Sequence, residues 1–377
     1  MRKQVLQLAA AGVGAGLALG AGAAATKLYA SRFRSVRSLN CVMEKGEFGV
    51  YDMRIDYPYD IDRVISRGIF DDESLSEAIV KEALPLLPAH IGTSHFGCSA
   101  ASFADGQGNV FMLRNYDYKD DTSALLVHCA PKRGYRSVGT VALNKIGACN
   151  LHKMKKRLAC LTAPFICLDG MNEKGVSIAV LTIDSEPVFQ QTGKPVIVPT
   201  LAIRLVLDRA ASTAEAVELM RGYDMLASAG RDYHYYISDA TGDGRVVEYD
   251  CDSPSRELRA TPVRTVTNFY ELYRDRARGP RDEQVDESRK RYGHGKDRYE
   301  RIEAVLSKDE AVGRLSKLSA WEALEASSQL PHPGDATSNT QWSIVYNLRT
   351  RTAEMALRRD FSRIVSYGLG GVQAPSA

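Results

Sequence analysis

The sequence lacks the residue spacings that usually hold metal ions or redox centres. It has seven cysteines and seven histidines. No two cysteines show the C-x-x-C spacing of a zinc or redox site, and the histidines are scattered. The odd number of cysteines permits one free thiol beside paired ones but proves no disulfide. We therefore expect neither a metal site nor a cofactor.

An excess of charge of one sign is also missing. The 377 residues include 49 lysines and arginines against 46 aspartates and glutamates, a formal net charge of +3, so we expect no nucleic-acid partner. The basic clusters at 153–157 and 274–281 are typical of solvated surface, with an anionic substrate or a membrane surface as the less favoured reading. A hydrophobic content of 44% indicates a soluble globular chain with ample material for a core.

The N-terminus has the pattern of a leader. Arg2 and Lys3 precede an uncharged run of small and apolar residues at 5–25, as in an export signal or a signal anchor. The run is near the ~20 residues needed to span a bilayer, and the basic residues that follow favour retention as an anchor, although cleavage stays open. We therefore expect residues 1–40 to be a signal peptide or membrane anchor with a basic flank, and the protein to be exported or membrane-anchored, outside the cytoplasm.

The most informative stretch is 95–118. Cys98 precedes a β-prone run, and a Gly-x-Gly turn leads into a second β-prone run that delivers Arg114, Asn115 and Asp117. Two strands joined by a tight glycine turn lie antiparallel, so the thiol and the Arg114/Asp117 pair should lie near one end of a hairpin. An arginine favours thiolate over thiol, and a carboxylate can hold a proton donor in place. This stretch therefore predicts nucleophilic catalysis by a cysteine.

The rest of the chain supplies strands in hairpins and a middle block of helices. Further predicted elements are an amphipathic helix around 75–84 capped by Asp71 or Asp72, helices at 200–211 and 214–223, an exposed charged excursion at 274–296, and hairpins at 234–249 and 342–357. This order indicates layered α+β architecture rather than alternating βαβ units.

Four motifs in order resemble the choloylglycine hydrolase group of N-terminal-nucleophile hydrolases. The group includes bile salt hydrolases, penicillin V acylases, acyl-coenzyme A:6-aminopenicillanate acyltransferases and other linear amide hydrolases. The motifs are Cys98 with Arg114-Asn115-Tyr116-Asp117, Asp169-Gly170-Met171-Asn172-Glu173-Lys174-Gly175, the hairpin from Tyr235 to Tyr249 with Val247-Glu248, and Thr267-Asn268. The resemblance covers roughly Cys98 to the last hairpin, which is most of the ordered chain.

The resemblance implies a fold and a maturation step. The fold would be a four-layer αββα sandwich, and the nucleophilic cysteine would become the N-terminus of the mature chain. Its free α-amine, with a pKa of about 7.7, would then act as the base. Because Cys98 is internal, autoproteolysis of the Gly97–Cys98 bond would be needed. Residues 41–97 would then be an N-terminal prosegment or subdomain, and residues 98–377 the catalytic domain.

The resemblance also implies residue roles. Cys98 would be the nucleophile, Asp117 the partner that holds its α-amine, and Arg114 the residue that orients the thiol. Asn268 would donate to the oxyanion formed on the attacked amide carbonyl. The reaction would be cleavage of a linear carbon–nitrogen bond in a small N-acyl amide through an acyl-enzyme, with hydrolysis and acyl transfer both open.

Two positions depart from the bile-salt pattern. Thr182 stands where a second oxyanion asparagine is expected, and Gln341 stands where a late arginine is expected. We predict that both are substrate-binding or oxyanion residues. The two changes favour the acyltransferase and fatty-acid-amide branch of the family. Asp169 and Asn172 are expected to shape their turn, and His234 to be a strand residue with a satisfied ring.

Two other functions remain open. The chain could be an inactive, membrane-tethered binding protein that kept the fold, and a Cys-His-Asn protease ranks last because no histidine lies in a matching signature. The leader permits membrane association, and a homo-oligomer is also permitted.

Overall fold

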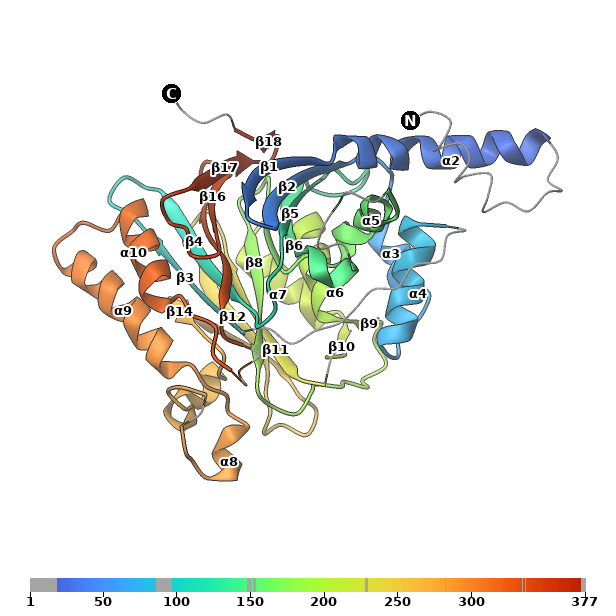
Figure 1. Ribbon diagram of the computed structural model, residues 1–377. Helices are drawn as coiled ribbons and strands as arrows, with labels where there is room; N and C mark the ends of the chain where they lie inside the picture. The colour runs from blue at the N-terminus through green and yellow to red at the C-terminus, as the bar shows by residue number, and fades with distance from the viewer. Residues whose placement is uncertain are drawn as a thin grey trace.

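The computed structural model describes residues 19–85, 97–147, 151, 154–227, 230–281, 283–333, 335 and 337–373 (Figure 1). Most of the predicted leader run, and the segment 86–96 that precedes the predicted cleavage site, lie outside the described residues.

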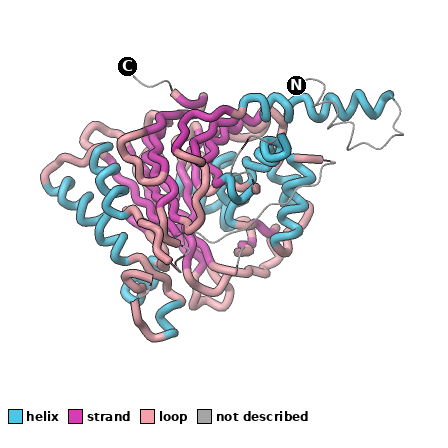
Figure 2. Tube along the Cα trace, in the orientation of Figure 1, coloured by secondary structure: helices cyan, strands magenta, loops and turns pink. Residues whose placement is uncertain are grey.

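Two sheets form the centre of the described chain (Figure 2). The nine-stranded sheet consists, in spatial order, of β1 (Asn40–Lys45), β2 (Phe48–Ile55), β5 (Ala124–Cys129), β6 (Ser137–Ala142), β7 (Asp169–Asn172), β8 (Ser177–Ile183), β11 (Asp232–Ser238), β12 (Gly244–Tyr249) and β13 (Leu258–Pro262). The seven-stranded sheet consists of β14 (Thr265–Val266), β3 (Gly97–Ala104), β4 (Val110–Asp117), β15 (Thr340–Asn347), β16 (Thr352–Leu357), β17 (Ile364–Gly368) and β18 (Gly371–Val372). A small parallel pair joins β9 (Val196–Ile197) and β10 (Asp224–Met225).

Helices cover the outer face of each sheet. The helices of the described residues are α2 (Leu19–Ser38), α3 (Ile61–Ile65), α4 (Asp72–Ala83), α5 (Met154–Ala159), α6 (Pro199–Arg209), α7 (Thr213–Arg221), α8 (Glu287–Lys290), α9 (Lys296–Ala311) and α10 (Lys317–Ser327), with 3-10 turns η1 (Leu143–Ile146), η2 (Cys160–Phe165) and η3 (Glu271–Arg276). Helices α6 and α7 pack on the nine-stranded sheet, and α9 and α10 pack on the seven-stranded sheet. Between these two helix layers, β3 of the seven-stranded sheet packs against β8 and β11 of the nine-stranded sheet (Figure 1). The predicted α+β, four-layer αββα arrangement is confirmed.

The predicted local elements also appear. Asp71 caps α4 in a reciprocal capping box with Ser74. The two later hairpins are β11–β12 and β15–β16. The six cysteines that the structure describes are all free.

The predicted exposed excursion at 274–296 is wrong in part. Ala277, Arg278, Tyr292 and His294 are all buried. The many charges in this segment suggested full solvation, but several of them face carboxylates of the protein body, so the segment folds back onto the sheet end.

Residues 40–85 are built into the body of the protein. Strand β2 pairs in parallel with β5 over six residues, from Val50 opposite Ala124 to Ile55 opposite Cys129. Arg32, in the last turns of α2, is buried and donates to the carbonyl oxygens of Glu82 (2.8 Å) and Ala83 (2.7 Å). The folded body therefore begins before residue 40.

Helix α2 extends away from this body towards the N-terminus (Figure 1). None of the helices in the described ranges combines the length and apolar character needed to span a bilayer. The leader within residues 1–40 stays a prediction.

Candidate active site

The hairpin β3–β4 places the predicted nucleophile. Gly108 adopts φ +80°, which a glycine accepts without strain, at the turn between the strands. The register sets Gly97 opposite Asp117 and Cys98 opposite Tyr116. Because side chains alternate along a strand, Cys98 shares a face with Tyr116, whereas Asp117 lies on the other face. The predicted hairpin is confirmed, and it presents the thiol and the carboxylate on opposite sides of its end.

Arg114 contacts the thiol. Its Nη2 lies 3.1 Å from Cys98 Sγ, its Nη1 donates to the Val180 carbonyl oxygen at 2.8 Å, and its Nε lies 2.7 Å from Asp169 Oδ2. Arg114, Cys98 and Asp169 are all fully buried. Burial raises the pKa of the Cys98 thiol to about 12 against the opposing charge of Arg114. In the uncut chain the thiol is therefore protonated at neutral pH.

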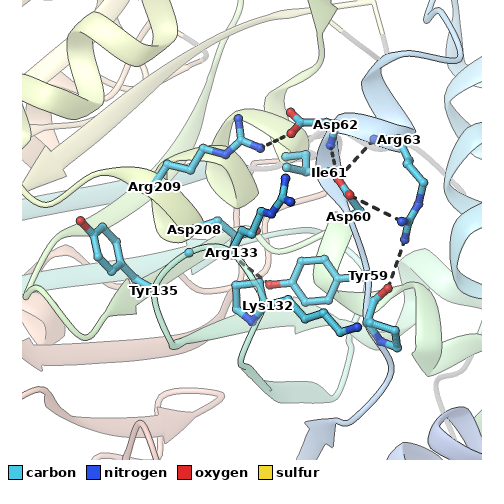
Figure 3. A pocket seen from close by; sticks show the side chains of 13 residues that line it. Tyr59, Asp60, Ile61, Asp62, Arg63, Lys132, Arg133, Tyr135, Asp208 and Arg209 are labelled. Atoms are coloured by element: carbon cyan, nitrogen blue, oxygen red, sulfur yellow. Dashed lines mark hydrogen bonds and ion pairs between the residues drawn. The ribbon is translucent and has the colours of Figure 1, made fainter.

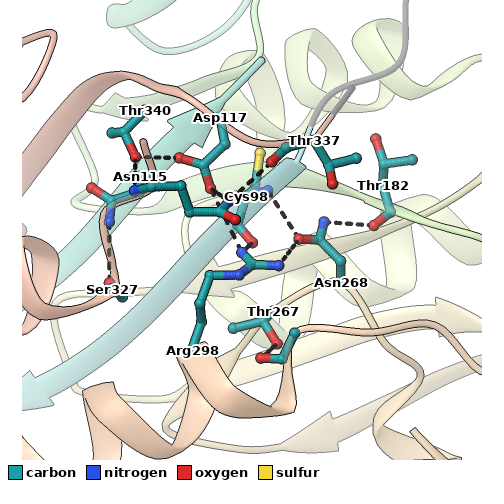
Figure 4. A network of polar contacts seen from close by, with 12 residues as sticks. Cys98, Asn115, Asp117, Thr182, Thr267, Asn268, Arg298, Ser327, Thr337 and Thr340 are labelled. Atoms are coloured by element: carbon teal, nitrogen blue, oxygen red, sulfur yellow. Dashed lines mark hydrogen bonds and ion pairs between the residues drawn. The ribbon is translucent and has the colours of Figure 1, made fainter. Parts of the chain in front are cut away.

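Both backbone polar groups of Cys98 are held by side chains (Figure 4). Its N–H donates to Asn268 Oδ1 at 3.1 Å, and its carbonyl oxygen accepts from Arg298 Nη1 at 2.9 Å. Arg298 Nη2 also donates to Asn268 Oδ1 at 2.7 Å. Asn268 Nδ2 donates to the Thr182 carbonyl oxygen at 2.7 Å. Asn268 and Arg298 thus fix the backbone of the cysteine.

The carboxylate of Asp117 accepts hydrogen bonds from side chains on its own face of the hairpin. Its Oδ1 accepts from Thr340 Oγ1 at 2.6 Å, and its Oδ2 accepts from Gln329 Nε2 at 2.8 Å. Arg298 Nη1 lies 3.6 Å from Oδ2. Burial raises the pKa of Asp117, and Arg298 is the strongest influence that opposes this rise. In this structure the N–H of Cys98 meets Asn268, and the side-chain carboxylate of Asp117 is linked to the cysteine through Arg298.

The structure places Thr182 beside Asn268, whose Nδ2 donates to the Thr182 carbonyl oxygen. Thr182 is buried, and its Oγ1 has no hydrogen-bond partner among the described residues. A buried hydroxyl without a partner costs free energy unless something else uses it. This hydroxyl is therefore the strongest candidate donor for a substrate oxygen.

Gln341 is not brought to Cys98. A β-bulge between Thr340 and Trp342 displaces it from the regular register. Its Nε2 donates to the Tyr118 carbonyl oxygen at 3.0 Å, and its Oε1 accepts from the Thr122 N–H at 3.0 Å. Its amide therefore secures the loop after β4, and the structure gives no support to Gln341 as an oxyanion or substrate donor.

The sequence reasoning missed Arg298, the residue that joins Cys98, Asn268 and Asp117. It lies in the first turn of α9, 200 residues after the cysteine, within a strongly charged helix that resembles a solvated one. Gln329, which follows α10 and donates to Asp117, was also missed. The sequence did hold a signal for Arg298. Because the family resemblance implies an arginine late in the chain, the whole segment after Asn268 can be searched for a matching arginine.

A cavity of the described residues lies elsewhere (Figure 3). It has a volume of about 800 Å³ and is lined by residues 58–63, 131–135 and 208–209. Strand registers place the 131–135 loop at the end of the sheet where β8 begins, whereas Thr182 lies near the other end of β8. This cavity is therefore separate from the Cys98 site. The described residues contain no group of His, Cys, Asp and Glu side chains that could hold a metal ion.

Comparison with known proteins first defines the class. The chain is similar in structure to a mutant of the conjugated bile acid hydrolase from Clostridium perfringens, with a TM-score of 0.53 and 14% sequence identity over 72% of this chain and 92% of that one. It is also similar to penicillin V acylase from Agrobacterium tumefaciens, with a TM-score of 0.51 and 16% identity over 72% and 86%. The fold is therefore that of these N-terminal-nucleophile hydrolases, as the resemblance implied.

The family follows from the sequence match. The family model described as acyl-coenzyme A:6-aminopenicillanic acid acyl-transferase matches residues 104–360, and the chain belongs to this family. The match includes Arg114, Asp117 and Asn268 and begins six residues after Cys98. No curated protein sequence matches the chain.

Proposed function

We propose that this chain is an amide hydrolase or acyltransferase in which Cys98 becomes the N-terminal nucleophile. The observation that carries the proposal is that every polar atom of Cys98 has a functional partner. Its Sγ meets Arg114, its N–H meets Asn268, and its carbonyl oxygen meets Arg298. A structural core cysteine needs none of these buried charges.

Maturation would start with attack of Cys98 Sγ on the carbonyl carbon of Gly97. The peptide C–N bond breaks, the nitrogen takes the thiol proton, and a thioester to Gly97 forms. Water then hydrolyses the thioester, which leaves a Gly97 carboxylate and a free α-amine on Cys98. Gly97 suits this step because it places no side chain in the way of the attacking thiol.

Turnover would use the new α-amine as the base. A buried thiol with a pKa of about 12 ionises poorly by itself, whereas an α-amine with a pKa of about 7.7 can take its proton. Asn268 Oδ1, which already accepts from this nitrogen at 3.1 Å, would orient the amine, and Asp117 would act on it through Arg298. Asn268 Nδ2 is engaged by the Thr182 carbonyl oxygen, so Thr182 Oγ1 is the better oxyanion donor.

The chemical step then follows. The thiolate attacks the amide carbonyl of the substrate, and the negative charge collects on the carbonyl oxygen. The C–N bond breaks, the amine leaves with the proton held by the α-amine, and the acyl group stays on Sγ. Water or a second amine accepts the acyl group and regenerates the thiol. The substrate class is a small N-acyl amide.

A substrate panel tests this proposal. Purified protein should hydrolyse at least one of N-acyl amino acids, glycine and taurine bile salts, or phenoxyacetyl amides, and mass spectrometry should trap the acyl group on Cys98. Cys98→Ala should show neither result. The alternative is an inactive binding protein that kept the fold. A correctly processed wild-type chain that is inert to the whole panel would favour that alternative.

A further inference from the structure

The motif at 169–175 holds a buried charge that the proposed mechanism does not use. Asn172 shapes the turn after β7, as expected, because its Oδ1 accepts from the Val176 N–H at 3.1 Å. Asp169, at the start of β7, instead reaches across to the seven-stranded sheet, where its carboxylate contacts Arg114 and Tyr346. The expected turn role holds for Asn172, whereas Asp169 has a different role.

Asp169 forms an ion pair with Arg114 between the two sheets. Its Oδ2 lies 2.7 Å from Arg114 Nε, and neither side chain is exposed. Its Oδ1 accepts from the Tyr346 hydroxyl at 2.6 Å. Arg114 Nη2 lies 3.1 Å from Cys98 Sγ. One guanidinium therefore contacts both the carboxylate of Asp169 and the thiol of the nucleophile.

The fixed charges around Cys98 cancel. Arg114 lies 2.7 Å from Asp169, and Arg298 lies 3.6 Å from Asp117, so two guanidinium groups meet two carboxylates. All four side chains are buried. A thiolate would add a fifth charge without a partner, which is strongly unfavourable in a buried site. Burial, with both carboxylates acting in the same direction and Arg114 opposing them, raises the pKa of the Cys98 thiol to about 12.

The other titratable groups nearby stay neutral. Tyr116 lies opposite the nucleophile in the hairpin, and Tyr346 and Tyr367 lie around Asp169. Burial raises the pKa of all three hydroxyls above the usual value for tyrosine. Burial also raises the pKa of the Cys167 thiol, two residues before Asp169. At neutral pH none of these groups alters the charge balance.

Removal of the Asp169 charge would unbalance this group. The Arg114 guanidinium would be buried without its carboxylate, and Cys98 Sγ, 3.1 Å from its Nη2, could supply the negative charge by ionising. Because Asp169 and Cys98 contact the same guanidinium, their charged atoms lie within about 8 Å of each other. At an effective dielectric constant of about 20, two unit charges at this distance interact by about 1.5 pKa units.

We propose that Asp169 keeps the nucleophile in its neutral thiol form by neutralising Arg114, and that Tyr346 holds the Asp169 carboxylate in this role. Asp169 is thus a positioning residue that acts on Cys98 through Arg114. The consequence for catalysis rests on the proposed function. A nucleophile that is kept neutral at rest gives up its proton only when the α-amine of the processed chain takes it.

The test measures how fast iodoacetamide alkylates Cys98, read by mass spectrometry of the peptide that contains it. The thiolate is the reactive form, so below the titration midpoint the rate follows the thiolate fraction. Asp169→Asn should raise this rate about 10- to 100-fold, which corresponds to a shift of about 1–2 pKa units. Arg114→Gln should lower it, because the guanidinium that stabilises the thiolate is lost.

Opposite signs distinguish this role from a structural one. If the ion pair only joined the two sheets, loss of either partner would loosen the site and speed alkylation alike. An unchanged rate in Asp169→Asn, or equal signs for Asp169→Asn and Arg114→Gln, therefore overturns the inference. Rates are compared between chains of the same form, as intact mass shows. Gly97→Val, whose side chain stands in the way of the attacking thiol, supplies uncut chains where the wild type is processed.

Asp208→Asn is the matched control. Asp208 is 2% exposed, lies 2.7 Å from the buried Arg204 and accepts from the Tyr59 hydroxyl at 2.9 Å. This variant therefore removes the same charge from a second buried group of tyrosine, aspartate and arginine. It should leave the alkylation rate of Cys98 unchanged, and a rise equal to that of Asp169→Asn overturns the inference.

Tyr346→Phe decides if Asp169→Asn fails to fold. It removes the hydroxyl that stabilises the carboxylate charge, so it should raise the alkylation rate by about 2- to 10-fold, the effect of one hydrogen bond. Tyr59→Phe removes the matching hydroxyl from the second group and should not change the rate. Equal rates in these two variants reject the inference.

The alkylation measurements need neither processing nor turnover, so they separate this inference from the proposed function. If no amide is turned over but the two opposite signs are found, the amidase proposal fails and the role of Asp169 stands. If amides are turned over but Asp169→Asn leaves the alkylation rate unchanged, the amidase proposal stands and the role of Asp169 is rejected.

Discussion

Replacement of Arg298 should damage both the stability and the maturation of the protein. Arg298 is 3% exposed and donates to the Cys98 carbonyl oxygen at 2.9 Å and to Asn268 Oδ1 at 2.7 Å. It also lies 3.6 Å from Asp117 Oδ2. Arg298→Met would leave a buried carboxylate without its nearest positive charge, a change that usually costs about 3–5 kcal/mol.

The stability should be measured in a Cys98→Ala background, so that every chain compared is uncut. Equilibrium urea unfolding should show the loss of about 3–5 kcal/mol for Arg298→Met. Asp117→Asn added to Arg298→Met removes the orphaned charge, so the double variant should lose about 0.5–3 kcal/mol less than the sum of the single variants. With Cys98 intact, Arg298→Met should also slow the appearance of the processed fragments.

Arg301→Met is the matched control. Arg301 lies one turn further along α9, is exposed, and pairs with Asp297 at 2.9 Å. Its loss should cost about 0.5 kcal/mol or less. Equal costs for the two arginines, or strict additivity with Asp117→Asn, would refute the idea that Arg298 links Asp117 to the cysteine.

Three further results are expected. If the Thr182 hydroxyl stabilises the oxyanion, Thr182→Val should lower kcat by about 10²- to 10³-fold. Thr182→Ser should stay largely active, and neither variant should be less stable than the wild type. Unchanged turnover in Thr182→Val would count against that role. Burial raises the pKa of Asp232 from 3.8 to about 6, so the native state holds this proton more tightly than the unfolded chain. Stability should therefore fall as pH rises from about 4 to 6, by up to about 3 kcal/mol, and urea unfolding of Asp232→Asn across this range should lose that slope. After processing, the fragment that contains β2 should co-elute with the remainder in gel filtration and separate only in denaturant, because β2 pairs with β5 inside the nine-stranded sheet; separation in buffer would contradict this.

The sequence predicted the structure correctly where residues close together in the chain determine it. The hairpin around Cys98 needs a glycine turn and two β-prone runs, and all three are adjacent in the sequence. The layers were also predictable, because strands grouped in hairpins with helices between them leave few arrangements that bury both.

Contacts between distant segments explain what the sequence did not reveal. Arg298 is a buried member of a charged helix, and only the packing of α9 against β3 distinguishes it from exposed arginines such as Arg301. The role of Gln341 was predicted from its position beside Trp342. In the structure a single β-bulge directs its side-chain amide to the loop after β4. Strand β2 was not predicted because its sequence contains charged residues and its pairing partner, β5, lies about 70 residues further along the chain.

The mass and N-terminal sequence of the purified protein test the central claim most directly. Wild-type protein and Cys98→Ala should be expressed and analysed side by side. The account predicts a wild-type fragment that begins at Cys98 and a second that ends at Gly97, whereas Cys98→Ala stays one uncut chain across this bond. An uncut wild-type chain that still hydrolyses linear amides would contradict the N-terminal-nucleophile mechanism.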